Sequence, residues 1–280
     1  MANKVWFITG TSKGFGRVWA EAALARGDQV AATARDVTTL TPLVERYGHQ
    51  VAAIALDVTD RAAVGAAIKE AHARFGRLDV VVNNAGYGLF GTIEEVSEAE
   101  ARAQIETNLF GALWVTQAAL PIMRAQGSGH IIQVSSVGGI NAFPTVGLYH
   151  ASKWGLEGFS QSLAAEVAVH GIKVTIIEPA GYATDWVGPS AQRAKQIPAY
   201  DGARAAVALM RSKNPPGDPQ ATGPAILKVV DAQEPPLRVF FGSVGLPLTR
   251  AEYAKRLETW EEWSPVSIEA QGNLPHKAPR

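Results

Sequence analysis

The chain has 280 residues, of which 47% are hydrophobic and 19% are charged, a balance typical of a soluble globular enzyme and unlike that of a disordered protein. The 26 Lys and Arg residues equal the 26 Asp and Glu residues, so we expect no bulk attraction to nucleic acid or to an anionic membrane. The chain contains no cysteine, which excludes disulfides, a thiolate nucleophile and a cysteine-ligated metal, and we expect no metal site of another kind.

The N-terminus enters a short apolar run within a few residues. Residues 5–9 read VWFIT, the pattern of a buried parallel strand. No signal-peptide pattern precedes this run, and no apolar run in the chain reaches the ~20 residues that a membrane-spanning helix needs. We therefore expect a cytoplasmic protein that does not bind a membrane.

A glycine-rich turn follows this first strand and precedes an amphipathic helix that extends to Arg26. A strand, a glycine-rich turn and a helix N-terminus form an anion site, because free backbone N–H groups and the helix dipole face a phosphate. The GxxxGxG spacing differs from the commoner GxGxxG, so the turn alone does not identify a dinucleotide. The predicted cofactor contacts in this turn are Gly10, Thr11, Ser12, Lys13, Gly14, Phe15 and Gly16.

The second strand ends at Ala34-Arg35-Asp36. In a dinucleotide fold this point meets the adenosine ribose, where an acid suits a free 2′-hydroxyl and an arginine suits a 2′-phosphate. Arg35 and Lys13 flank one predicted pocket, which favours NADP(H) over NAD(H). The alternative is that both are ordinary solvated side chains. We expect Asp36 to face solvent and to start the next helix.

Strands and helices then alternate along the chain. The alternation predicts an α/β fold, a Rossmann-type doubly wound parallel sheet of about seven strands with helices on both faces. We expect the strands at residues 5–9, 29–33, 51–56, 78–82, 131–134, 173–177 and 238–241. We expect helices that end near Arg26, Gly48, Phe75, Gln126, His170, Met210, Asp231 and Trp263, with irregular chain after Pro265.

Several of these helices carry cap signals. Thr38 or Thr39 is expected to open the second helix and Thr59 to cap the third. Ser97 and Glu100 form a capping box for the long helical region that follows.

Tyr149 and Lys153 stand four residues apart in a run with helical apolar spacing. Residues i and i+4 share one face of a helix, so the phenol and the ammonium point the same way. A free tyrosine has a pKa of about 10. A nearby cation lowers that pKa and makes Tyr149 a usable general acid/base. The alternative is a surface tyrosine with a lysine one turn on, a pair common in any helix.

The predicted strand ends favour the catalytic interpretation. In doubly wound sheets, ligands bind at the carboxyl ends of the strands. The residues at such ends are Thr9, Gly10, Ala34, Arg35, Asp57, Asn83, Asn84, Ala85, Ser136 and Pro179. A chance pair of tyrosine and lysine would lack this coincidence.

Together these motifs resemble the short-chain dehydrogenase/reductase family, in its single-domain branch. The likeness extends motif by motif over residues 4–184 and more loosely to Gly242. It implies one NAD(P)-binding domain over residues 1–280 and NADP(H)-dependent interconversion of a ketone or aldehyde and an alcohol. It is carried by TGTSKGFG (Thr9–Gly16), Asp57-Val58, NNAG (Asn83–Gly86), Asn108, Ser136 and YHASK (Tyr149–Lys153).

The resemblance implies a catalytic tetrad of Asn108, Ser136, Tyr149 and Lys153. Ser136 would donate a hydrogen bond to the substrate oxygen, and Tyr149 would give that oxygen a proton. Lys153 would favour the phenolate and bind the nicotinamide ribose, and Asn108 would hold a water that links Lys153 to solvent. The family's spacing of serine to tyrosine, together with strand alternation, selects Ser136 over the adjacent Ser135.

The resemblance also implies further cofactor contacts. Asp57 and Val58 would border the adenine. Ala180 stands where the family usually has a glycine, which puts the local backbone shape in question. The remaining expected contacts with the cofactor are Asn84, Ala85, Gly86, Pro179 and Thr184, besides Tyr149 and Lys153.

Beyond Thr184 the family has its substrate lid, here expected over residues 185–220, and residues 243–280 would form a C-terminal helical extension and tail. Trp260 and Trp263 would share one face and cover the pocket rim or a subunit contact, and His150 is interpreted as structural. The expected pocket walls, with ordinary packing as the alternative for each, are Tyr87, Phe90, Phe143, Tyr182, Trp186 and Val187.

Three functions stay open at this point. The first is an NADP(H)-dependent carbonyl reductase or alcohol dehydrogenase, the second a binding module that keeps the dinucleotide fold, and the third an epimerase or dehydratase. Resemblance further implies a homodimer or homotetramer that pairs through Ala101–Arg124 and Tyr149–His170. The expected partner is a small carbonyl or alcohol substrate, with no nucleic acid.

Overall fold

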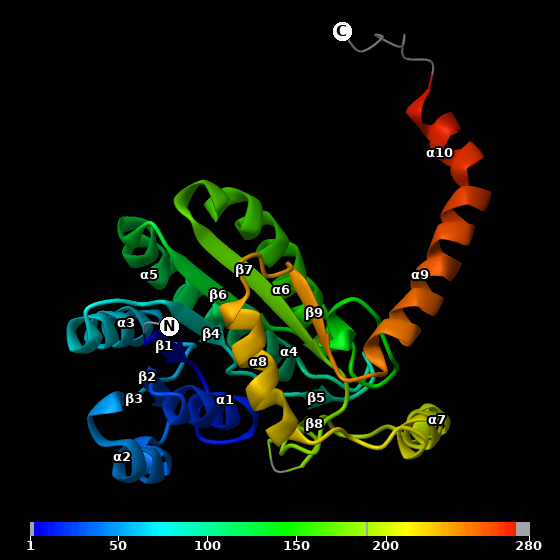
Figure 1. Cartoon of the computed structure of the whole chain (residues 1–280). Helices are drawn as coiled ribbons and strands as arrows, with labels where there is room; N and C mark the ends of the chain where they lie inside the picture. Colours follow the sequence, from blue (N-terminus) through cyan, green and yellow to red (C-terminus); the bar gives the residue numbers. More distant parts are fainter. Residues whose placement is uncertain (1–2, 189, 273–280) are drawn as a thin grey trace, which may run out of the picture.

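A parallel sheet forms the centre of the protein, whose computed structural model describes residues 3–188 and 190–272 (Figure 1). Among these residues the sheet has seven strands in the order β3-β2-β1-β4-β6-β7-β9, and every neighbouring pair is parallel. The order reverses between β1 and β4, which is where doubly wound sheets open a ligand crevice. The strands are β1 (Val5–Ile8), β2 (Gln29–Ala34), β3 (Val51–Ala55), β4 (Val80–Asn83), β6 (Gly129–Val134), β7 (Ile172–Pro179) and β9 (Arg238–Phe241). The predicted fold class is confirmed.

Helices cover both faces of this sheet. One face packs against α1, α2 and α8, and the other against α3, α5 and α6. A π-helical turn, Glu106–Phe110, joins α4 to α5. The helices are α1 (Gly14–Ala25), α2 (Thr41–Tyr47), α3 (Arg61–Phe75), α4 (Glu98–Ile105), α5 (Gly111–Gln126), α6 (Gly147–Val167), α7 (Asp201–Ser212), α8 (Thr222–Asp231), α9 (Gly245–Glu262) and α10 (Ser264–Gln271).

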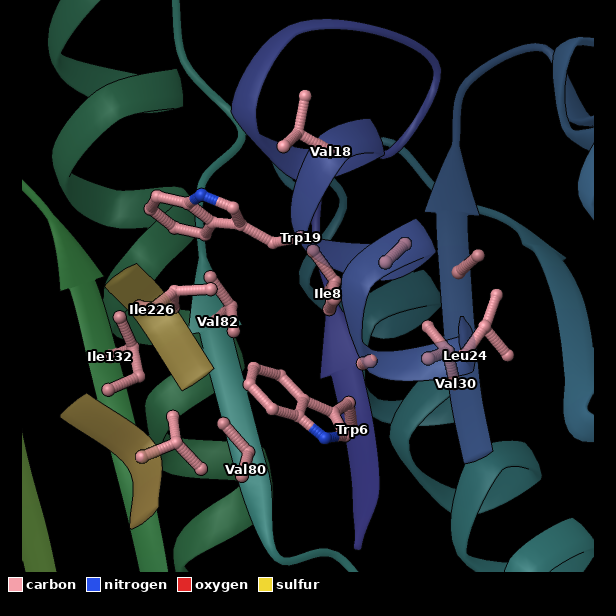
Figure 2. Packing of buried hydrophobic residues seen from close by; sticks show 14 of the residues in the cluster. Trp6, Ile8, Val18, Trp19, Leu24, Val30, Val80, Val82, Ile132 and Ile226 are labelled. Carbon is pink, nitrogen blue, oxygen red and sulfur yellow. The ribbon is translucent and has the colours of Figure 1, made fainter. Parts of the chain in front are cut away.

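Strand alternation divides the core into two layers. In β1 the side chains of Trp6 and Ile8 join one layer, and those of Val5 and Phe7 join the other. Figure 2 shows Trp6 close to Val80 and Trp19 of α1 in the same layer. Burial of each such large side chain stabilises the fold by roughly 1.5–3 kcal/mol.

Both indole N–H groups in this layer have acceptors. Trp6 Nε1 donates to a carboxylate oxygen of Asp28 at 2.8 Å, and Trp19 Nε1 donates to Thr222 Oγ1 at 2.8 Å. Trp19 thereby connects α1 to α8. A buried indole without an acceptor would lose stability, so these bonds let two large rings occupy the core.

The helix caps differ from the predictions at two points. Asp36, which is also expected to start this helix, caps the second helical segment through Thr38 N, and the expected opening by Thr38 or Thr39 is wrong. Asp60, rather than Thr59, caps α3. Asp36 precedes the predicted threonines and Asp60 follows Thr59, and both aspartates have the extended backbone that a cap requires. The capping box of Ser97 and Glu100 at α4 is confirmed.

The C-terminal helices extend away from the sheet (Figure 1). The predicted irregular chain after Pro265 is wrong up to Gln271, because Ser264–Gln271 forms α10, with Pro265 in its first turn, where it costs no hydrogen bond. Trp260 and Trp263 are 62% and 60% exposed, so neither covers a pocket rim in this chain. Among the residues described, no helix is long and apolar enough to cross a membrane.

Candidate active site

The glycine turn after β1 has a backbone that side chains would obstruct. Gly10 and Gly14 have φ of +69° and +60°, in the left-handed region that favours glycine. A Cβ on Gly16 would collide with the Gly10 carbonyl oxygen. Within the described chain, α1 begins without a side-chain cap, so its first N–H groups remain available to an anion. The turn therefore fits the pyrophosphate of a dinucleotide.

Thr11 supports this turn from inside. Its hydroxyl donates to the Ile8 carbonyl at 2.9 Å and accepts from Thr33 N at 3.0 Å. Its own N–H donates to the Thr33 carbonyl at 2.8 Å. Thr11 thus holds β1 to β2, and its polar groups are paired within the protein.

A hydrogen-bonded clamp connects the turn to the end of β4. Asn84 Nδ2 donates to the carbonyls of Thr9 and Gly10 at 2.9 and 3.0 Å. Thr9 Oγ1 accepts from the backbone N–H groups of Asn84 and Ala85, both at 2.9 Å. The amide of Asn84, predicted as a cofactor contact, is therefore occupied in shaping the crevice at the point where the strand order reverses.

The end of β2 presents one basic side chain to solvent. Ala34 is buried, and Arg35 is exposed, with no ion pair to any other described residue. Asp36 Oδ1 accepts from Thr38 N and Thr38 Oγ1 at 3.0 and 2.6 Å, so its carboxylate starts the next helix as predicted. Nothing acidic therefore competes for Arg35 at this strand end.

Lys13, the second predicted basic contact, has an acidic partner. Its Nζ lies 3.2 Å from an Asp185 carboxylate oxygen, and both side chains are about half exposed. An exposed pair of this kind contributes about 0–1 kcal/mol. Lys13 is consequently tied to the segment after Thr184.

Asp57 and Val58, the expected adenine contacts, follow the end of β3. Asp57 Oδ1 accepts from Thr59 N and Thr59 Oγ1 at 3.0 and 2.8 Å. Val58 is buried against Gly111, where a Cβ would collide with the valine side chain. The first residue of α5, directly after the π-helical turn, therefore packs against Val58, just after the end of β3.

The four predicted catalytic residues come from three elements. Tyr149 and Lys153 are buried on α6, and Ser136 opens the turn after β6. Asn108 lies in the π-helical turn, and its Nδ2 donates to Ser152 Oγ on α6 at 3.2 Å. A Cβ on Gly86 would approach Asn108 Oδ1 to 3.0 Å and Lys153 Nζ to 3.8 Å. Topology therefore brings together residues that are separated by up to 45 positions in the sequence.

The polar atoms of this group are held by the backbone. Lys153 Nζ donates to the Val134 carbonyl at 2.7 Å. Ser136 Oγ accepts from Gly138 N at 3.0 Å. Asn108 Nδ2 donates to the Tyr87 carbonyl at 3.0 Å, and its Oδ1 accepts from Tyr87 N at 3.1 Å.

The pKa values of the pair on α6 are set chiefly by burial. Burial raises the pKa of Tyr149 to about 12, and a hydrogen bond from Ser136 opposes that rise. Burial lowers the pKa of Lys153 to about 8, and the Glu157 carboxylate opposes that fall. The expected lowering of the Tyr149 pKa by Lys153 is therefore not found, because desolvation of the phenolate outweighs the distant ammonium, 5.9 Å from the ring centroid.

His150 connects α6 to the turn that carries Ser136. Its Nδ1 lies 2.8 Å from the Gly138 carbonyl, and its Nε2 accepts from Phe143 N at 2.9 Å. The two bonds require the proton on Nδ1. Burial lowers the pKa of His150, which favours this neutral form. The structural interpretation of His150 agrees with these contacts.

Three of the predicted pocket walls lie around Tyr149. Phe90, Phe143 and Trp186 form one cluster with it. The ring centroid of Trp186 lies 4.9 Å from that of Tyr149 and 5.1 Å from that of Phe90. Trp186 therefore covers the phenol from the segment that follows Thr184.

Tyr182 and Val187, two further expected pocket walls, lie outside the aromatic cluster around Tyr149. Tyr182 packs edge-on against Phe15, with ring centroids 5.0 Å apart, and so lies beside the glycine turn rather than in the aromatic cluster. The parallel bridge of Tyr182 to Gly217 holds it there. Val187 is 43% exposed. Tyr87 is half-buried and is held through its backbone.

Ala180 is accommodated without distortion of its strand end. Its N–H donates to the Phe241 carbonyl at 2.9 Å, which continues the pairing of β7 with β9. Gly242, at φ +98°, has no side chain to oppose the methyl group. Pro179 is buried at the end of β7, and Thr184 Oγ1 lies 3.4 Å from Trp186 N.

Sequence reasoning missed several residues of this site. Ser152 Oγ donates to the Tyr149 carbonyl at 2.6 Å and accepts from Asn108 Nδ2 at 3.2 Å, and only its place on the same helix signals this role. Gln104 accepts from Leu89 N at 2.8 Å and so holds the loop after β4. Glu157, one helical turn after Lys153 on α6, is buried next to Glu178 of β7, and the two form a buried carboxylate pair.

Comparison with known proteins gives consistent relatives. A family model described as short chain dehydrogenase matches residues 4–195. Oxidoreductase BOA17 of Botryotinia fuckeliana is 46% identical over 270 residues, which cover 95% of this chain and 98% of that protein. A short-chain dehydrogenase from Streptomyces avermitilis has a crystal structure with a TM-score of 0.90 and 39% identity, covering 96% of this chain and 98% of that one. The alcohol dehydrogenase of Thermococcus sibiricus complexed with 5-hydroxy-NADP has a TM-score of 0.73 and 26% identity, covering 87% and 98%.

Proposed function

We propose, from the premise that this chain belongs to the short-chain dehydrogenase family of oxidoreductases, that it interconverts a ketone or aldehyde and an alcohol with NADP(H) as cofactor. The family uses a nicotinamide cofactor and acts on small molecules. The observation that carries the proposal is the buried phenol of Tyr149, which has Ser136 beside it and Lys153 on the same helix face.

Tyr149 is the proposed general acid/base. A pKa raised to about 12 keeps the phenol protonated at neutral pH, so its resting form is a proton donor. This state suits reduction, in which the carbonyl oxygen gains negative charge and then a proton. Ser136 is the proposed second donor to that oxygen.

Lys153 and Asn108 are the proposed proton supply. Lys153 has a pKa lowered to about 8, close enough to neutrality for its ammonium to return a proton to Tyr149. Asn108 lies beside Gly86, and its Nδ2 donates to Ser152 Oγ on α6, the helix that carries Tyr149 and Lys153. Asn108 therefore connects the π-helical turn with α6, which carries the two proposed proton-transfer residues.

The cofactor site is proposed in the crevice at the carboxyl ends of the strands. The glycine turn would bind the pyrophosphate, Asp57 and Val58 the adenine, and Arg35 the 2′-phosphate. When bound there, the cofactor supplies or accepts a hydride at the substrate carbon. The other proposed contacts are Lys13, Ala85, Gly86, Tyr149, Lys153, Pro179 and Thr184.

Residues 185–220 are the proposed substrate lid within a single domain of residues 1–280. Trp186 against Tyr149 and the pair of Asp185 with Lys13 support this proposal, since both join the segment to the site. Residues 243–280 are the proposed extension, of which 273–280 lie outside the described residues. We also propose a cytoplasmic homodimer or homotetramer.

A steady-state assay tests the function. Purified protein is mixed with NADPH or NADH and a panel of ketones and aldehydes, and consumption of the reduced cofactor is followed by absorbance. We expect turnover with NADPH on at least one carbonyl compound. Binding of NADPH without turnover on any of them would favour a binding module instead, and product formation without net cofactor consumption would favour an epimerase or dehydratase.

A further inference from the structure

A cavity of about 190 Å³ lies next to the aromatic cluster, lined by residues of the small β5–β8 ladder and of α7. The ladder pairs Leu89–Phe90 with Gln192–Arg193 in parallel. Phe90 belongs both to the cavity wall and to the cluster that contains Tyr149 and Trp186. Two edge-on ring contacts, Phe90 with Trp186 and Trp186 with Tyr149, connect the cavity wall to the catalytic phenol.

Two arginines border this cavity around the ring of Phe90. The Cζ atom of Arg193 lies 4.8 Å from the ring centroid, and that of Arg211 lies 5.1 Å from it. They come from different elements, Arg193 from β8 and Arg211 from the last turn of α7. The pair therefore depends on how β8 and α7 pack around Phe90.

Neither arginine has a carboxylate partner among residues 3–188 and 190–272. The guanidinium of Arg193 donates to the Val187 carbonyl at 2.7 Å, and the guanidinium of Arg211 makes no hydrogen bond to those residues. Burial, and after it the positive charge of Arg193, lowers the pKa of Arg211, as expected for two like charges placed around one ring. A cation over a phenylalanine ring gains only ~0.5–1 kcal/mol at an exposed site.

The acid and the third arginine in the cavity wall are already paired. Glu95 is buried and accepts from Thr92 N at 2.8 Å and from Ile197 N at 2.7 Å. Arg204 is paired with Glu95 and with Asp201, both at 2.5 Å. These bonds neutralise Arg204 and leave the charges of Arg193 and Arg211 facing the cavity.

We propose that this cavity binds an oxyanion group of the substrate, a carboxylate in the first instance, between Arg193 and Arg211. Guanidinium groups bind carboxylates through two parallel N–H···O bonds, and an anion between them would remove their mutual repulsion. The proposal rests on the proposed function, because it requires the carbonyl of the same molecule to reach Tyr149. The substrate is then a keto acid whose apolar chain crosses Trp186 and Phe90.

The test uses a series of straight-chain keto acids, in which the number of methylenes between carbonyl and carboxylate increases, and the methyl ester of each. With wild-type protein and NADPH, we expect kcat/KM to favour the acid over its ester by at least ~10-fold at one optimal spacing, the effect of one or two charge-assisted hydrogen bonds. Arg211→Ala and, separately, Arg193→Ala should remove this preference and leave the ester unchanged. Having both variants keeps the test decisive if one of them fails to fold.

Lys195→Ala is the matched control, since Lys195 is exposed, lies two residues from Arg193 and is absent from the cavity wall. It should keep the preference for the acid. An ester turned over as well as the acid at every spacing, or an equal loss for acid and ester in Arg211→Ala, would overturn the proposal in favour of a purely structural pair. Phosphonate and sulfonate analogues of the best acid then distinguish the oxyanion that is preferred.

A binding measurement separates this proposal from the proposed function. Calorimetric titration of a dicarboxylate without a carbonyl group, and of its diester, should give binding of the diacid that weakens at least ~10-fold in Arg211→Ala. If no carbonyl compound is reduced but the diacid binds in this way, the function fails and the anion site stands. If ketones are reduced and the diacid does not bind, the function stands and the anion site is refuted.

Discussion

Replacement of Arg35 by alanine should weaken binding of NADPH and leave binding of NADH nearly unchanged. Arg35 is exposed at the end of β2 and has no ion pair within the described ranges, so its guanidinium is available to a 2′-phosphate without loss of an existing partner. The one neighbouring acid, Asp36, is bonded to Thr38 at the start of the next helical segment. Its carboxylate forms no ion pair with Arg35 among the described residues.

The expected magnitude follows from these contacts. A phosphate carries roughly −1.5 to −2 charge near neutrality. Charge-assisted hydrogen bonds contribute about 1.5–3 kcal/mol each, and exposure of Arg35 reduces that figure, so about 1.4 kcal/mol or more remains, a tenfold rise in the NADPH dissociation constant. Lys13→Ala should have a smaller effect, because Asp185 already holds the ammonium at 3.2 Å.

Fluorescence titration of both cofactors into wild type, Arg35→Ala and Arg74→Ala measures these effects. Arg74 is an exposed arginine near the end of α3, so its removal controls for the change in net charge. Asp185→Asn releases Lys13 and should tighten NADPH binding modestly. The reasoning is refuted if Arg35→Ala weakens NADPH and NADH equally, or if wild type prefers NADH.

Three further predictions use other parts of the structure. Tyr149→Phe keeps the buried ring and removes the proton donor, so kcat should fall by ~10²–10⁴ with little change in cofactor affinity, and turnover close to wild type would contradict the proposed acid. Burial and the neighbouring Glu157 carboxylate raise the pKa of Glu178 from 4.5 to about 8, so the folded protein keeps a proton that the unfolded chain loses. The stabilising effect of this bound proton is therefore complete below pH 4.5 and is lost as the pH rises to about 8. Urea unfolding at several pH values should show a smaller loss of stability over this window in Glu178→Gln than in wild type. The exposed control Glu166→Gln should behave as wild type. Light scattering at micromolar protein should return a dimer or tetramer, and a mass near 29.7 kDa would argue against it.

Elements determined by local chemistry were predictable from the sequence. Short continuous apolar runs and glycine punctuation locate the seven strands, because burial on both faces of a parallel sheet demands such runs. The capping box at Ser97 and the shared helix face of Tyr149 and Lys153 involve residues three or four apart, so helix geometry alone sets them. The two cap errors, at Asp36 and Asp60, concern a shift of a few residues between good capping side chains.

Contacts between distant segments required the structure. Trp186 lies against Tyr149, Asp185 pairs with Lys13, and Arg193 meets Arg211 around one ring, and no local pattern marks any of these pairs. Their positions depend on how the segment after β7 returns across the strand ends.

The sequence by itself determined the order of strands and helices, the glycine turn and the identities of the residues that could perform proton transfer, since each follows from the spacing of neighbours along the chain. Tertiary structure decided the environment of those residues. Desolvation depends on everything packed around a group, so only the fold could show that burial moves the pKa of Tyr149 up to about 12 and that of Lys153 down to about 8.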